Sequence, residues 1–178
     1  MSTLSIPVNS NDHIQGPASA PVTLVQYGDY QCSYCGEAFG VIKRIQSEFG
    51  DALRFVFRDF PLPEIHPEAR SAAVTAEYCG SQGHFWPAHD ALYTNQAALG
   101  ENLYAEIVEK LGLDVDGLHR AFSTDEFAQR IQNDIDGGIR SGVNGTPAFF
   151  INGQMYQVQG SFDELADPIG RLVTHSRD

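Results

Sequence analysis

Hydrophobic and polar residues follow patterns that predict two strands joined by a helix in the first third of the chain. Residues 22–27, VTLVQY, are mostly β-branched or aromatic, which is typical of a buried strand. Apolar residues then recur at spacings of three, three and four, as on one face of a helix: Phe39, Ile42, Ile45 and Phe49. Gly50 ends this helix. Residues 52–60, ALRFVFRDF, alternate again and predict a second strand.

The pattern changes to that of helices between residues 67 and 141. Four helical pieces are predicted at about residues 67–80, 84–95, 103–111 and 115–122. Ser123 and Glu126 have the spacing of a capping box, which predicts the start of a fifth helix. Gly142 ends that helix, and its apolar stripe consists of Phe127, Ile131, Ile135 and Ile139.

The last part of the chain predicts a hairpin and a final helix. Two short β-prone runs, residues 148–151 and 155–159, flank Asn152-Gly153, which is a strong signal for a type I′ turn. Ser161 and Glu164 form a second capping box. The helix that it opens carries an apolar stripe of Phe162, Leu165, Ile169 and Leu172.

This order of elements predicts an α/β protein. A β-α-β half with a parallel strand pair precedes a helical block, and a β-β-α half follows, which together predict a mixed central sheet with helices on both faces. Residues 1–20 are expected to form an N-terminal arm. Residues 21–64 and 143–178 form the sheet domain, and residues 65–142 form an inserted helical domain.

Composition and charge exclude some partners. The chain has 178 residues and a formal net charge of −12, which argues against binding to nucleic acid or to anionic membrane surfaces. No apolar run is long enough to cross a bilayer, and the N-terminus lacks the basic and apolar regions of a signal peptide. We therefore expect a cytoplasmic protein. The alternative is a periplasmic or extracytoplasmic protein from which an export signal was removed.

Two of the three cysteines, Cys32 and Cys35, form a Cys-x-x-Cys pair where the first strand meets the first helix. A helix N-terminus has unpaired N–H groups and a partial positive charge, which favour a thiolate. Cys32 is therefore predicted to attack a substrate disulfide, and Cys35, three residues further on, to resolve the mixed disulfide. The only redox group required is the Cys32–Cys35 disulfide, with no cofactor.

Two other interpretations of the cysteines compete with redox chemistry. A structural zinc site needs four ligands, and His84 and His89 are five apart, a poor spacing for one helical face; we expect no metal. A purely structural disulfide is the other alternative. Cys79 lies in an alanine-rich helix and is interpreted as a small buried hydrophobic residue.

Three segments carry a resemblance to a known family. They are APVTLVQYGDYQCSYC, HPEARSAAVTAEYCGSQGHFWPAHDALY and GVNGTPAFFINGQ. Over residues 12–173 the chain resembles the DsbA-like thioredoxin-fold oxidoreductases, many of which oxidise substrates in the bacterial envelope. The resemblance implies a thioredoxin fold with an inserted helical domain. It also implies that Thr146-Pro147 is a cis peptide packed against the cysteines, where the Thr146 backbone pairs with an extended substrate.

The chain departs from this family at two places. Gln26 occupies a position that commonly carries a buried acid, and an amide cannot transfer a proton, so water or Asp29 is expected to do so. The alternative for Asp29 is a cap at the strand end. Between the cysteines, Ser33 can offer its backbone N–H to the Cys32 thiolate, and Tyr34 is expected to face solvent and contact substrate.

The function predicted from these residues is a protein thiol-disulfide oxidoreductase that works with protein or peptide substrates and an unidentified redox partner. A thioredoxin-like peptide-binding or chaperone module with an incidental disulfide is the alternative. Glutathione-conjugating enzymes on this architecture generally lack an intact Cys-x-x-Cys. The remaining histidines and aromatic residues near the helical block are interpreted as caps or packing residues: His66, His84, His89, Phe85 and Trp86.

Overall fold

The structure, a computed structural model, describes residues 1–178 and divides into two compact units. The first, here called the sheet unit, consists of Met1–Gly28, Glu37–Arg58 and Gly137–Asp178. The second, called the helical unit, consists of Asp29–Gly36 and Asp59–Asp136. Residues 29–36, which include both cysteines of the Cys-x-x-Cys pair, thus belong to the helical unit.

The sheet is five-stranded and mixed, in the order β1-β3-β2-β4-β5. Its strands are β1 (His13–Gln15), β2 (Val22–Gly28), β3 (Leu53–Asp59), β4 (Ala148–Ile151) and β5 (Gln154–Tyr156). The pairs β1–β3, β2–β4 and β4–β5 are antiparallel. Neighbouring β2 and β3 are joined through helix α1 (Ser33–Phe49), the type of crossover that parallel strands need. The predicted α/β class is confirmed.

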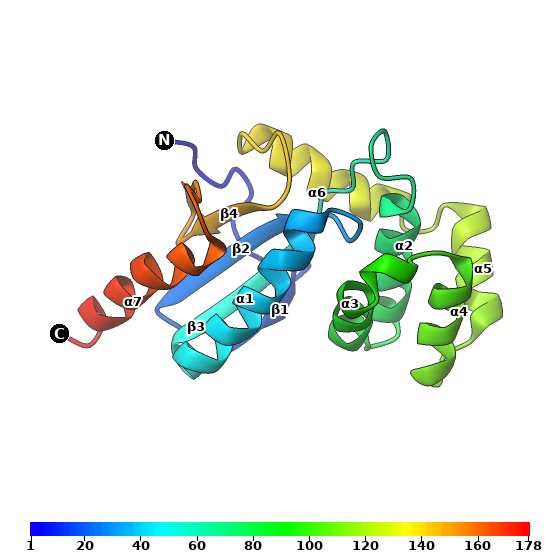
Figure 1. Cartoon of the computed structure of the whole chain (residues 1–178), viewed down its shortest axis with the longest axis horizontal. Helices are drawn as coiled ribbons and strands as arrows, with labels where there is room; N and C mark the ends of the chain where they lie inside the picture. Colours follow the sequence, from blue (N-terminus) through cyan, green and yellow to red (C-terminus); the bar gives the residue numbers. More distant parts are fainter. The chain divides into compact units, whose positions relative to one another are not determined.

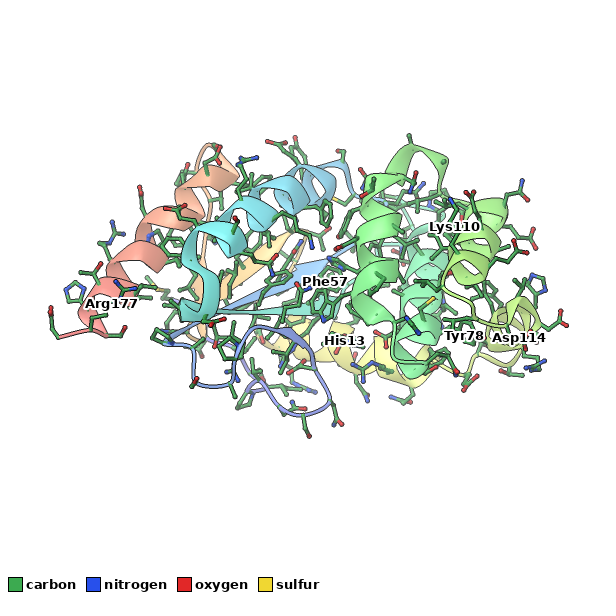
Figure 2. The ribbon with its side chains drawn as sticks, turned by 90° about the horizontal axis from the view of Figure 1, so that it is seen from below. His13, Phe57, Tyr78, Lys110, Asp114 and Arg177 are labelled. Atoms are coloured by element: carbon green, nitrogen blue, oxygen red, sulfur yellow. The ribbon has the colours of Figure 1, made fainter.

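Both faces of the sheet are covered. Consecutive residues of β2 are buried, with Leu24, Val25 and Tyr27 at most 1% exposed, which requires packing on both sides. Figures 1 and 2 show α1 and α7 (Ala166–His175) on the same side of the sheet. The 3-10 helix η1 (Gly50–Ala52) leads from α1 into β3.

The hairpin after β4 is formed as predicted. Asn152 and Gly153 both have positive φ, 48° and 83°, as a type I′ turn requires. The following strand β5 ends at Tyr156, three residues earlier than expected. The reason is the capping box: the Glu164 carboxylate accepts hydrogen bonds from the backbone N–H groups of Gln159 and Gly160, which removes this segment from the sheet.

The capping box of Ser161 and Glu164 is present, but it opens the 3-10 helix η3 (Phe162–Leu165) and α7 follows. Within α7 the buried face continues from Ile169 to Val173, four residues further on, whereas Leu172 of the predicted stripe is 38% exposed.

The N-terminal arm is partly ordered into the sheet, which the sequence did not predict. His13 of β1 lies opposite Phe57 of β3 (Figure 2). Arg58 holds the arm by two 2.8 Å bonds to the carboxylate of Asp12, and Arg58 and Asp12 are both nearly buried. This ion pair joins residues far apart in sequence, so no local pattern reveals it.

The helical unit contains α2 (Ala69–Ser81), α3 (Phe85–Thr94), the 3-10 helix η2 (Gln96–Ala98), α4 (Glu101–Lys110), α5 (Val115–Thr124) and most of α6 (Ala128–Arg140). Helix α2 is central and contacts α3, α4 and α5 (Figure 1). Its small buried residues let the neighbouring helices pack closely against it: Ala69, Ala72, Ala73 and Ala76. The Tyr78 hydroxyl at its end donates to the Asp114 carbonyl oxygen at 2.6 Å (Figure 2).

Two details predicted for α6 are wrong. Ser123 does not cap it, because Ser123 lies inside α5, where its hydroxyl donates to the carbonyl oxygen of Arg120. Ile139 is 58% exposed instead of lying on a buried stripe. Gly137 is buried there, and a Cβ on it would lie 3.1 Å from the Ile6 side chain, so the N-terminal arm covers this turn.

Candidate redox site

The active-site loop, defined here as residues 29–36, turns directly from the end of β2 into α1. The Cys32 N–H donates to the carbonyl oxygen of Asp29 at 3.2 Å, which closes a turn. The carbonyl oxygen of Cys32 accepts the N–H of Gly36 at 3.1 Å, which begins the helix. Cys32 therefore lies immediately before the first turn of α1 and Cys35 within it, where unpaired N–H groups favour negative charge.

The residues of the Cys-x-x-Cys segment differ in their exposure to solvent. Cys35 is fully buried and Cys32 is 5% exposed, so Cys32 is the more accessible of the two, although only slightly. Tyr34 between them is 65% exposed, which confirms that it faces solvent. Its contact with substrate stays a prediction, as does donation of the Ser33 N–H to the Cys32 thiolate.

Asp29 anchors the loop through a buried carboxylate. Its Oδ1 accepts the N–H of Gln31 at 2.8 Å, and its Oδ2 accepts the N–H of Leu62 at 2.9 Å. Nδ1 of His66 also lies 2.8 Å from Oδ2, so this ring nitrogen carries the hydrogen and donates. The sequence did not indicate that His66 contacts Asp29. The role of Asp29 in proton transfer stays a prediction.

The other residues predicted for the site lie in the sheet unit. Gln26 is 2% exposed within β2 and pairs in register with Phe149 of β4. The Thr146-Pro147 peptide bond is cis and directly precedes β4. The packing of Pro147 against the cysteines and the pairing of Thr146 with substrate stay predictions.

Within the helical unit, aromatic side chains of α3 pack against Tyr30 of the loop. The hydroxyl of Tyr30 lies 2.8 Å from Nδ1 of His89, and the ring of Tyr30 packs on that of Tyr93 at 4.8 Å between centroids. The Tyr93 hydroxyl donates to the carbonyl oxygen of Asp29 at 3.4 Å. Burial, and then the charge of Cys35, raise the pKa of Tyr93 well above its usual value. Tyr93 therefore stays a protonated phenol close to the cysteines.

Gln96 of η2 holds the loop from the other side. Its Nε2 donates to the carbonyl oxygens of Tyr30 and Cys32, both at 2.8 Å. Nothing in the sequence pattern identified this residue, because the bonded groups are more than 60 positions apart.

Cys79 is removed from this chemistry by its burial. It is 0% exposed in α2, and burial raises the pKa of its thiol to about 12. This agrees with its interpretation as a buried hydrophobic residue. No group of three or more His, Cys, Asp or Glu side chains in the structure is arranged to hold a metal ion.

Comparison with known proteins places the chain in a family. The profile of the thioredoxin family matches residues 8–170. The structure is similar to oxidised BdbD of Bacillus subtilis, with a TM-score of 0.84 and 22% identity over 97% of this chain and 98% of the other. It is also similar to the thiol-disulfide exchange protein alpha-DsbA2 of Wolbachia pipientis, with a TM-score of 0.75 and 20% identity over 92% and 88% of the two chains.

A curated relative is longer than this chain. The Na+/H+ antiporter NhaA 1 of Salinispora arenicola is 40% identical over 175 residues, which are 98% of this chain but 27% of the antiporter. The chain thus spans about a quarter of the length of the curated relatives it matches.

The expectation of a cytoplasmic protein is wrong. It rested on the lack of a long apolar run and of a signal peptide in this chain, whereas a region similar to the chain occurs within the longer Na+/H+ antiporters. None of the helices combines the length and the apolar character of a membrane span.

The sheet order, the Cys-x-x-Cys pair at the start of α1 and the inserted helices agree with these similarities. The family match covers most of the chain, and the structural similarity extends over nearly all of it. The chain therefore belongs to the thioredoxin family and has the fold of the DsbA-type oxidoreductases.

Proposed function

We propose that this protein is a thiol-disulfide oxidoreductase that exchanges disulfides with protein substrates through Cys32 and Cys35. The observation that carries the proposal is the position of Cys32, directly before the first turn of α1 in a loop held by the hydrogen bonds of Asp29 and Gln96. A structurally similar protein from Wolbachia pipientis is described as a thiol-disulfide exchange protein, which supports the same class of reaction here.

In the reducing direction, the Cys32 thiolate attacks one sulfur of a substrate disulfide. The substrate S–S bond breaks, a mixed disulfide with Cys32 forms, and the leaving sulfur takes a proton. Cys35 then loses its proton and attacks the Cys32 sulfur, which releases the second substrate thiolate. The protein ends as the Cys32–Cys35 disulfide, two electrons have passed to the substrate, and oxidation of a dithiol is the reverse sequence.

Other residues have supporting roles in this proposal. The Ser33 N–H is proposed to donate to the Cys32 thiolate, and Tyr34, which is exposed, to contact the substrate next to the reacting sulfur. The backbone of Thr146, two residues before β4, pairs with an extended substrate segment beside Pro147. Since Gln26 cannot transfer a proton, Asp29 or water takes the proton of Cys35.

The proposal concerns the region that the antiporter relatives share with this chain and not the rest of their length. We further propose an extracytoplasmic location, where a separate redox partner returns the Cys32–Cys35 pair to its starting oxidation state after each reaction.

Cysteine variants test the function. We expect Cys32→Ser to abolish reduction of insulin and oxidation of a dithiol peptide, and Cys35→Ser to accumulate mixed disulfides visible by mass spectrometry. Cys79→Ser is the matched control, because Cys79 is buried in α2, and it should retain full activity. Full activity of Cys32→Ser would refute the proposal.

Two further measurements separate the alternatives. Equilibration with glutathione measures the redox potential of the Cys32–Cys35 pair and so shows the direction of exchange. A potential of about −270 mV, like that of thioredoxin, favours a reductant. A potential of about −120 mV, like that of DsbA, favours an oxidant. A chaperone would instead be favoured by two results together. The Cys32→Ser/Cys35→Ser variant would suppress aggregation as well as wild type, and the wild-type protein would show no disulfide exchange.

A further inference from the structure

Gln96 connects the helical unit to the backbone of the reactive cysteine. Its single side-chain nitrogen donates to two carbonyl oxygens of the active-site loop, those of Tyr30 and Cys32, each at 2.8 Å. Both hydrogens of the amide group are therefore used on one short stretch of backbone. The residue begins η2, directly after α3, and is half-buried.

Gly36 fits against the other end of the same amide. A Cβ placed on Gly36 would lie 2.4 Å from Oε1 of Gln96, closer than real Cβ contacts. Gly36 is inside α1 and its φ is negative, so the helix itself does not require glycine there. Glycine in a helix costs about 1 kcal/mol relative to alanine, and here it leaves room for the end of the Gln96 side chain.

The hydrogen bond from Gln96 to the Cys32 carbonyl oxygen also affects the N–H of Ser33, the donor next to the sulfur. The carbonyl of Cys32 and the N–H of Ser33 belong to one planar peptide unit, so fixing the oxygen also fixes the direction of the N–H. That oxygen accepts from both Gln96 and the N–H of Gly36. Hydrogen bonds to a carbonyl polarise the peptide and strengthen its N–H as a donor.

We propose that Gln96 is a positioning residue for thiol-disulfide exchange, because its amide holds the Cys32–Ser33 peptide in the orientation that favours Cys32 as a thiolate. Gln96 acts through the backbone and does not touch the substrate. The inference rests on the proposed function, since it matters only if Cys32 is the attacking sulfur.

Two substitutions at this position separate hydrogen bonding from shape. Gln96→Met keeps the length of the side chain but removes both donors. Gln96→Glu keeps the shape and places a carboxylate against two carbonyl oxygens, which repel it. Asn95→Ala is the matched control, because the neighbouring Asn95 amide is exposed and donates only to Ala91 of its own helix, at 2.9 Å.

The test measures alkylation of Cys32 by iodoacetamide as a function of pH in the reduced full-length protein, followed by peptide mass spectrometry. We expect the midpoint of the pH profile to rise by about one unit in Gln96→Met and by more in Gln96→Glu. Below both midpoints, this corresponds to about tenfold slower alkylation. Asn95→Ala should follow the wild-type profile.

Folding and function are controlled separately. Circular dichroism and urea unfolding identify any Gln96 variant that has lost its fold. In that case Gly36→Ala is used in its place, because its Cβ displaces the Gln96 side chain while alanine favours the helix. We expect Gly36→Ala to raise the midpoint of Cys32 alkylation as well. Profiles that match wild type in every folded variant, while wild type reduces insulin, would overturn the inference and leave the function intact. A wild-type protein that fails to exchange disulfides would overturn both.

Discussion

The hydroxyl of Tyr30 lies 2.8 Å from Nδ1 of His89, and the two side chains are only 1% and 3% exposed. Burial, followed by the charges of nearby acids, raises the pKa of Tyr30 well above its usual value. Tyr30 therefore keeps its proton, and its hydroxyl shares a buried hydrogen bond with Nδ1 of His89. Since Tyr30 is two residues before Cys32, this buried bond fixes one end of the active-site loop.

Replacing Tyr30 by phenylalanine should destabilise the protein. The ring packing on Tyr93 remains, but Nδ1 of His89 loses its buried hydrogen bond to the hydroxyl of Tyr30, which costs about 1–3 kcal/mol. Urea unfolding followed by circular dichroism measures the loss, with Tyr156→Phe, a half-buried tyrosine of β5, as the control. Equal stability of Tyr30→Phe and wild type would show that the bond contributes nothing.

Short sequence motifs predicted the structural elements that depend on only a few neighbouring residues. The Asn152-Gly153 turn and the Ser161–Glu164 capping box each depend on two to four residues, and both are present. The similar pattern at Ser123 is not used as a cap, because α5 continues through it. A short motif thus predicts an element only where the surrounding packing allows it.

The reactive pair could also be predicted, since two cysteines at a strand–helix junction already suggest their chemistry. Its surroundings could not. The bonds of Asp29 to His66, of Tyr30 to His89 and of Gln96 to Cys32 join residues separated by 37, 59 and 64 positions. Such contacts depend on how the inserted helices return to the loop, which the periodicity of each helix does not encode.

Asp29→Asn tests whether the carboxylate anchors the loop. The amide has one acceptor oxygen for three donors, so at least one buried donor is left without a partner, at a cost of about 1–3 kcal/mol. Urea unfolding checks this, with the exposed Asp51→Asn as control. Stopped-flow measurement of mixed-disulfide resolution adds a second result: a lower rate in the folded variant supports proton transfer by Asp29, and an unchanged rate leaves it as an anchor only.

Cys79 should resist alkylation in the folded protein. Because burial raises the pKa of its thiol to about 12, only about one thiol in ten thousand is ionised at pH 8. We expect iodoacetamide to label Cys32 but not Cys79 in the reduced native protein, as read by peptide mass spectrometry. The same treatment in urea should label Cys79 fully; rapid native labelling would contradict its burial.

A buried acid in the helical unit predicts how stability changes with pH. Asp59 is 1% exposed and lies near Glu77, whose carboxylate is paired with Arg130 at 2.5 Å. Burial, and then the charge of Glu77, raise the pKa of Asp59 well above its ordinary value of 3.8. The folded state thus favours the protonated carboxyl group, and the stability that it provides is complete below that ordinary value. It is lost as the pH rises towards the pKa of the folded state.

Asp59→Asn should remove this pH dependence, because the amide stays neutral and has nearly the same shape. The free energy of unfolding of wild type should fall relative to that of the variant between pH 4 and 8, by about 1.4 kcal/mol for each unit by which folding raises the pKa. Urea unfolding at pH 4, 6 and 8 measures the difference, and the exposed Asp51→Asn should follow wild type throughout. Parallel curves for wild type and Asp59→Asn would mean that Asp59 is ionised in the folded protein, with Arg130 sufficient to stabilise both carboxylates.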